Sequence, residues 1–127
     1  INALKDSYLS VGDPAHVPAG QYAAEALTKL NLWDKVQDRL ARAKDVRGAL
    51  ALVERAEAPY GIVYSTDAKV SQQVKTVAVF PADSHKPVVY PVSIVKGHDN
   101  ADSRDFLKYL ESDAAKKVLV GYGFSAK

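Results

Sequence analysis

Short apolar runs alternate with amphipathic segments through residues 8–70 of the chain. Each apolar run has the length of a buried strand, and each amphipathic segment repeats its apolar residues every three or four positions, as one buried face of a helix does. The pattern predicts strands at 8–11, 42–44 and 61–64 and helices at 19–30, 32–40, 46–56 and 65–70. This alternation is typical of an α/β fold with a parallel sheet and right-handed crossovers.

The pattern changes after residue 70. Residues 75–80 and 88–95 are strand-like, and a polar loop from Pro81 to Pro87 separates them. Pro91 lies inside the second run and favours an edge or crossing strand, because proline cannot donate to a sheet ladder. Helices are predicted at 102–110 and 113–120. We therefore expect a strand-like second segment that closes with two helices.

Composition narrows the classes of protein that remain. The 127 residues, 47% of them hydrophobic, can bury the core of one domain or of two small ones. The net charge is +2 with both signs interspersed, and the basic clusters lack the aromatic residues of a nucleic-acid surface. The sequence has no cysteine and therefore no disulfide or thiolate site. It also has no methionine, so we expect Ile1 to follow processing or truncation.

Three strand-to-helix turns are candidates for binding an anion. In an open parallel sheet the ligand crevice lies beyond the carboxyl ends of the strands, where the helices that follow begin. Backbone N–H groups in the first turn of a helix lack partners and attract negative charge. Such donors belong to Ala19, Gly20, Val46, Arg47, Ser65 and Thr66, and Tyr64 can add its hydroxyl. Every doubly wound α/β domain has such turns, so ordinary connections remain an alternative explanation.

Catalytic groups are much less evident. His16, His85 and His98 lie far apart in loops, without neighbours at the spacing of metal ligands. Asp13 is explained by the Asx turn that a Gly-Asp-Pro sequence favours. Arg47 either reaches an anion from the first turn of its helix or pairs with a nearby carboxylate. We therefore predict that the chain is not an enzyme and holds no metal centre or cofactor.

A family resemblance rests on several motifs in order. They are residues 11–20 (VGDPAHVPAG), 45–50 (DVRGAL) leading to 61–64 (GIVY), Phe80-Pro81 to Asp83-Ser84-His85, Tyr90-Pro91-Val92, and 121–124 (GYGF). In order and spacing these motifs resemble the periplasmic molybdate-binding proteins of bacterial ABC importers. The resemblance covers essentially all of the chain but only about the C-terminal half of that two-lobed family. It implies the type II periplasmic-binding-protein fold.

The resemblance also implies an arrangement of lobes. Residues 1–83 would form most of lobe two, an α/β lobe with helices on both faces of its parallel sheet. Residues 84–127 would form the hinge crossing and the returning C-terminal part of lobe one. Because the N-terminal half of the family is not in this sequence, the returning segment would lack the strands on which it packs. We therefore expect an associated or domain-swapped dimer if the chain stands alone.

The resemblance assigns a function and three residues to it. The family holds a tetrahedral oxyanion, molybdate or tungstate, by hydrogen bonds alone and delivers it from the periplasm to a membrane permease. The matching positions here are Ala19 and Val46, through their backbone N–H groups, and Tyr64, through its hydroxyl. Two serine-bearing turns of the family lie in the half that this sequence does not contain, so the site here would be incomplete.

Other functions remain open from the sequence. The chain could be a stand-alone α/β domain that senses an anion or contacts a partner. It could instead belong to a binding protein for another tetrahedral oxyanion, such as sulfate. An enzyme acting on a phosphate ester is a poorer candidate, because no base or metal set is evident.

Overall fold

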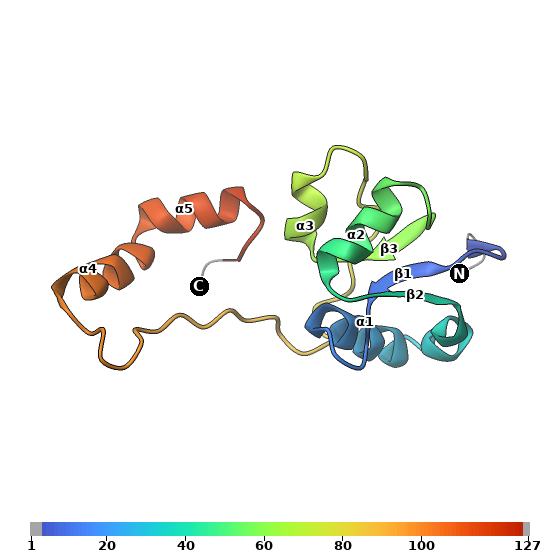
Figure 1. Cartoon of the computed structure of the whole chain (residues 1–127), viewed down its shortest axis with the longest axis horizontal. Helices are drawn as coiled ribbons and strands as arrows, with labels where there is room; N and C mark the ends of the chain where they lie inside the picture. Colours follow the sequence, from blue (N-terminus) through green and yellow to red (C-terminus); the bar gives the residue numbers. More distant parts are fainter. Residues whose placement is uncertain (1–3, 126–127) are drawn as a thin grey trace. The chain divides into compact units, whose positions relative to one another are not determined.

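A computed structural model describes residues 4–125 of the chain. It consists of two compact units that divide between Pro87 and Val88. The first unit holds a small sheet with its helices, and the second holds two further helices. Each unit is described by itself below (Figure 1).

The first unit is built on a three-stranded parallel sheet. Its strands are β1 (Leu9–Gly12), β2 (Leu40–Ala43) and β3 (Tyr60–Ile62). The strand order is β2-β1-β3, and β1 pairs in parallel with both neighbours. Val11 of β1 lies opposite Arg42 on one side and Ile62 on the other. The predicted parallel α/β fold is confirmed, and each strand lies within two residues of its predicted start.

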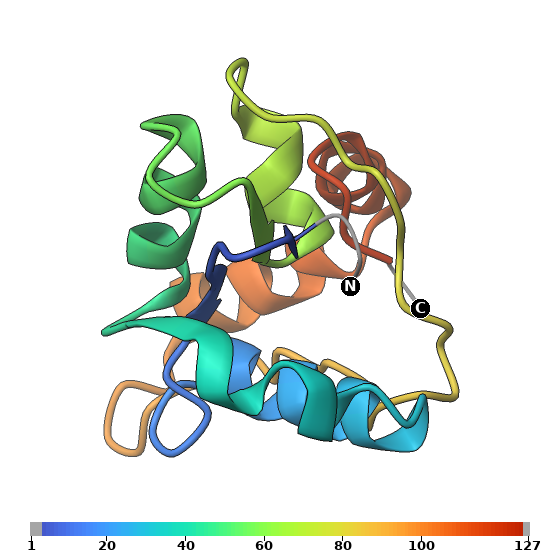
Figure 2. The same ribbon diagram turned by 90° about the vertical axis from the view of Figure 1, so that its right-hand side faces the viewer.

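Three helices follow these strands, and the first two of them connect one strand to the next. They are α1 (Pro18–Lys29), α2 (Val46–Glu54) and α3 (Ser65–Val70). The crossover from β1 to β2 runs one way across the sheet and the crossover from β2 to β3 runs back. Right-handed connections therefore place α1 and α2 on opposite faces, as Figures 1 and 2 show. All three helices begin at the edge where the strands end.

Small and aliphatic side chains let these helices pack closely on the sheet. Val11 of β1 is 1% exposed, and Ala26 of α1 and Ala49 of α2 are fully buried. Ser10 is also fully buried, and its hydroxyl donates to the carbonyl oxygen of Ala49 at 2.8 Å. That bond satisfies a polar group in the core, where an unpaired one is costly, and it fixes α2 on β1.

The predicted helix at 32–40 is wrong. The segment forms two 3₁₀ turns, η2 (Trp33–Lys35) and η3 (Gln37–Arg39), and Leu40 already belongs to β2. Val36 separates the turns with φ −130° and is 1% exposed. Its side chain packs in the apolar cluster with Leu9 and Leu27, so tertiary packing here overrides the local preference of the segment for a helix.

The predicted strands at 75–80 and 88–95 are also not found. Within residues 4–125 neither run belongs to a sheet, and most of their valines are exposed. Val79 is 74% exposed and Val89 is 72% exposed. Alternating apolar residues favour an extended backbone, but a strand also needs a neighbour that accepts its hydrogen bonds.

The second unit contains two capped helices. They are α4 (Ala101–Leu110) and α5 (Asp113–Gly121). Asn100 caps α4 in a reciprocal capping box with Ser103, and Ser112 caps α5 by accepting from the N–H of Ala115. These boundaries agree with the sequence prediction. No helix in the described part of the chain is long and apolar enough to cross a membrane.

Candidate functional site

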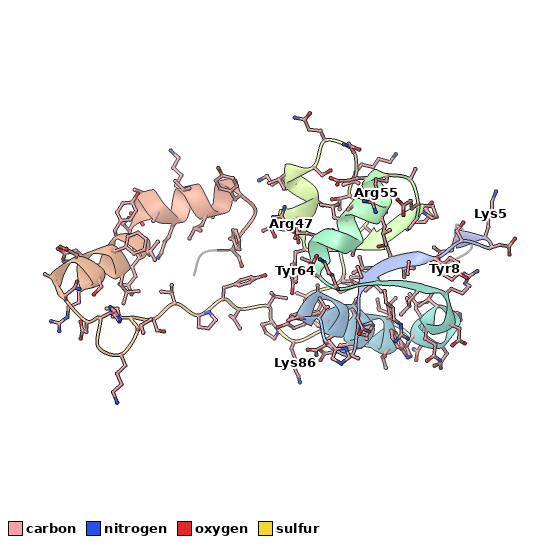
Figure 3. All side chains as sticks on the ribbon, viewed as in Figure 1. Lys5, Tyr8, Arg47, Arg55, Tyr64 and Lys86 are labelled. Atoms are coloured by element: carbon pink, nitrogen blue, oxygen red, sulfur yellow. The ribbon has the colours of Figure 1, made fainter. Side chains whose placement is uncertain are left out.

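The three predicted strand-to-helix turns lie at one edge of the sheet. Because β1, β2 and β3 are parallel, their carboxyl ends point the same way and α1, α2 and α3 all begin there. Figure 3 shows Arg47 and Tyr64, from the starts of α2 and α3, at this end of the first unit. The structure therefore brings together the turns that carry Ala19, Val46 and Tyr64.

The first turn leaves backbone donors unused at the start of α1. Val17 is the N-cap and supplies no side-chain hydrogen bond, and Pro18 occupies the first helical position. The first N–H to bond within the helix is that of Gln21, which donates to the carbonyl oxygen of Val17 at 3.0 Å. The N–H groups of Ala19 and Gly20 thus have no acceptor in the helix, although both residues are buried.

The second turn is capped so that its first donors stay available. The Asp45 carboxylate accepts from the N–H of Gly48 at 2.7 Å, and its carbonyl accepts from Ala49 at 3.2 Å. These bonds fix the start of α2 without using the N–H groups of Val46 and Arg47. Val46 is half-buried at the edge of the sheet. The cap therefore holds the Val46 donor in place.

The third turn places Tyr64 as the N-cap of α3. Its carbonyl oxygen accepts from the N–H groups of Asp67 and Ala68, at 3.0 and 3.1 Å. Tyr64 is half-buried. These hydrogen bonds fix the backbone of Tyr64 at the same edge of the sheet as the two backbone donors.

An ion pair joins the second and third turns. The Arg47 Nε lies 2.8 Å from the Asp67 Oδ1, and the Asp67 side chain is only 6% exposed. Of the two alternatives left open by the sequence, Arg47 therefore pairs with a carboxylate. Sequence reasoning did not identify Asp67 as the carboxylate that pairs with Arg47. The sequence placed Asp67 in the first turn of the third helix, but it carried no signal that this turn packs beside Arg47.

A second charged group lies in the first turn. The Asp13 carboxylate contacts the His16 Nδ1 at 2.7 Å, and the Arg42 guanidinium lies 3.7 Å from it. The hydrogen bond from His16 lowers the pKa of Asp13, helped by the N–H of Ala15. Asp13 also extends the sheet by one bond, because its N–H donates to the carbonyl oxygen of Ala43 at 2.8 Å.

The remaining candidate groups stay apart. The His85 Nδ1 lies 2.8 Å from the Lys86 carbonyl oxygen, and its ring meets Tyr22 edge-on with centroids 5.9 Å apart. Among residues 4–125 no three histidine, cysteine or carboxylate side chains gather as metal ligands would. The described edge of the sheet thus offers neutral hydrogen-bond donors beside charges that are paired internally, Arg47 with Asp67 and Asp13 with His16 and Arg42, and helix starts of this kind are suited to holding an anion.

Comparison with known proteins identifies the family. The family described as bacterial extracellular solute-binding protein matches residues 2–125. The chain belongs to this family. The chain is 98% identical over 127 residues to the molybdate-binding protein ModA of Haemophilus influenzae, and 57% identical over 124 residues to that of Escherichia coli.

The solved structures agree on the fold. The substrate-binding domain of a putative molybdenum ABC transporter from Clostridium difficile superposes with a TM-score of 0.84 at 36% identity, covering 99% of this chain and 56% of that one. The chain spans about half the length of the curated relatives, covering 50% of the Haemophilus influenzae protein and 48% of the Escherichia coli one. The predicted resemblance to molybdate-binding proteins and the predicted fold are confirmed, whereas the roles of Ala19, Val46 and Tyr64 stay a prediction.

Proposed function

We propose that this solute-binding chain supplies one side of a binding site for molybdate or tungstate. The observation that carries the proposal is the meeting of three strand-to-helix turns at one sheet edge, where α1, α2 and α3 begin. In this proposal Ala19 and Val46 donate backbone N–H groups to the oxyanion and Tyr64 donates its hydroxyl. The relatives named for molybdate and molybdenum support the choice of ligand.

Neutral donors can bind such a dianion tightly. Each oxygen of a tetrahedral oxyanion accepts hydrogen bonds, and hydrogen bonds to a charged acceptor are about twice as strong as neutral ones. The partial positive charge at the starts of α1 and α2 adds to them. Donors fixed on secondary structure select by the size and shape of the anion. This explains why molybdate and tungstate, which share both, are proposed together.

Membership of the family supports a proposal for the wider role. We propose that the gene product works in the periplasm, releases its oxyanion to the permease of an ABC importer, and carries out no chemical step. In that arrangement residues 1–83 form most of one lobe, and residues 84–127 cross back to the other. Donors from the other lobe would complete the shell around the oxyanion, because three donors cannot satisfy four oxygens.

Calorimetric titration of the full gene product tests this proposal. Molybdate and tungstate are titrated separately, with sulfate as the matched control because it has the same charge and shape but shorter bonds. We expect saturable binding of one equivalent of molybdate or tungstate and much weaker binding of sulfate. Absence of saturable molybdate and tungstate binding, or a preference for sulfate, would overturn the proposal.

A further inference from the structure

The ion pair between Arg47 and Asp67 ties together two of the elements that carry the proposed donors. Arg47 is the second residue of α2 and directly follows Val46. Asp67 is the third residue of α3, and its N–H donates to the carbonyl oxygen of Tyr64 at 3.0 Å. Val46 is therefore linked to Tyr64 in three steps. It is bonded to Arg47 along the chain, Arg47 pairs with Asp67, and Asp67 donates a hydrogen bond to Tyr64.

The two members of the pair have very different surroundings. The Arg47 side chain is 68% exposed, whereas that of Asp67 is 6% exposed. The Oδ2 atom of Asp67 is buried and has no hydrogen-bond partner among the described residues. Because a buried carboxylate depends on its few partners, the Arg47 contact is what holds Asp67 in one orientation.

The pair also removes a free charge from the edge of the sheet. A guanidinium so close to the Val46 donor would bind any oxyanion through its planar fork of N–H groups. The Nε of Arg47 instead faces Asp67 at 2.8 Å, so the pair as a whole is neutral. Selection then depends on where the fixed donors lie rather than on net charge.

We propose that Arg47 and Asp67 are positioning residues that set the relative placement of the Val46 N–H and the Tyr64 hydroxyl. The inference rests on the proposed function and deepens it. It assigns to Arg47 an action through Asp67 and not a direct contact with the oxyanion. Loss of either partner lets α3 shift against α2 and misplaces the two donors.

A second tie between the same helices provides a matched control. Ser71 lies at the end of α3 and Glu54 at the end of α2. The Ser71 hydroxyl donates to the Glu54 carboxylate at a distance of 2.5 Å. This bond joins the ends of the helices that lie away from the donors. Ser71→Ala therefore tests whether any weakening of the contact between α2 and α3 disturbs binding.

The experiment is a double-mutant cycle on molybdate affinity in the full gene product. Arg47→Gln and Asp67→Asn are each expected to weaken binding about tenfold, as loss of a supporting residue commonly does. Because the two act as one unit, the double variant should also be about tenfold weaker, whereas independent effects would multiply to about a hundredfold. Arg47→Lys should recover part of the affinity only where Asp67 is present, and Ser71→Ala should leave it unchanged.

The outcomes separate the inference from the function on which it rests. If the unchanged protein binds no molybdate, both are overturned. If it binds molybdate but the cycle is additive, or Asp67→Asn binds more tightly because Arg47 is released, only the positioning role is overturned. Arg47 is largely exposed, so its variants test the inference even if Asp67→Asn does not fold: full affinity in Arg47→Gln would contradict it.

Discussion

Gly20 in the first turn of α1 packs directly on Gly12 at the end of β1. A Cβ atom at position 20 would lie 2.0 Å from the carbonyl oxygen of Gly12 and 2.7 Å from its carbonyl carbon. Both obstacles are backbone, so neither can turn aside. Glycine at position 20 is therefore what lets the helix start reach the sheet edge and places the neighbouring N–H of Ala19 there.

Gly20→Ala should destabilise the protein and weaken oxyanion binding together. Relieving the overlap requires α1 to move from β1, which we expect to cost about 1–3 kcal/mol of unfolding free energy, as overpacking commonly does. Urea unfolding and molybdate titration measure the two effects. Gly48→Ala is the control, because a Cβ there lies 3.4 Å from its nearest neighbours, and it should leave both nearly unchanged.

Tyr64→Phe isolates the proposed phenolic donor. The substitution keeps the ring that packs at the start of α3 and removes only the hydroxyl. Losing a hydrogen bond to a charged ligand should weaken molybdate binding by about 1–3 kcal/mol. Tyr60→Phe, at the opposite end of β3, is the matched control and should bind normally. An unchanged affinity in Tyr64→Phe would remove this residue from the site.

Asp13 should titrate at unusually low pH. Its pKa is lowered chiefly by the hydrogen bond from His16, so Asp13 stabilises the fold above its unfolded pKa and loses that contribution as the pH falls through its folded pKa. Carboxyl carbon NMR through an acid titration measures the midpoint. His16→Ala should move the midpoint upward, toward the ordinary range of an aspartate. Equal midpoints in the two proteins would show that His16 is not the cause.

The 127-residue chain by itself should associate in solution. The runs 75–80 and 88–95 are strand-like in sequence, lie outside the sheet and expose apolar side chains along their edges, namely Val77, Val79, Val89, Val92 and Val95. Such edges pair with other copies unless another segment covers them. Sedimentation velocity over a range of concentrations should show dimers or larger species. A compact monomer at every concentration would contradict this expectation.

Local patterns predicted the elements that depend on local interactions. Apolar spacing and caps placed α1, α2 and α3, and Asn31 ends α1 with φ 56°, in the left-handed region that asparagine tolerates. The apolar spacing failed where tertiary packing decides the local structure. The segment around the buried Val36 forms two 3₁₀ turns instead of the predicted helix. Pairing with a distant segment is equally invisible to local sequence, so 75–80 and 88–95 were wrongly predicted as strands.

In the candidate site too, the sequence predicts some features and not others. The turns that carry Ala19, Val46 and Tyr64 follow from the strand and helix order, since parallel strands bring their carboxyl ends to one edge. The partner of Arg47 cannot be predicted from the order of strands and helices, because it depends on how α3 packs beside α2. The close contact of Gly20 with Gly12 likewise depends on how α1 packs on the sheet, and the residues next to Gly20 in the sequence do not predict it.

Locating the bound metal atom tests the three-donor site most directly. Crystals of the full gene product grown with molybdate would show molybdenum by its anomalous scattering. We expect one oxyanion with oxygens about 2.7–3.2 Å from the Ala19 N, the Val46 N and the Tyr64 hydroxyl. Molybdenum bound elsewhere, or an oxyanion held by Arg47 in place of these three atoms, would contradict the assignment.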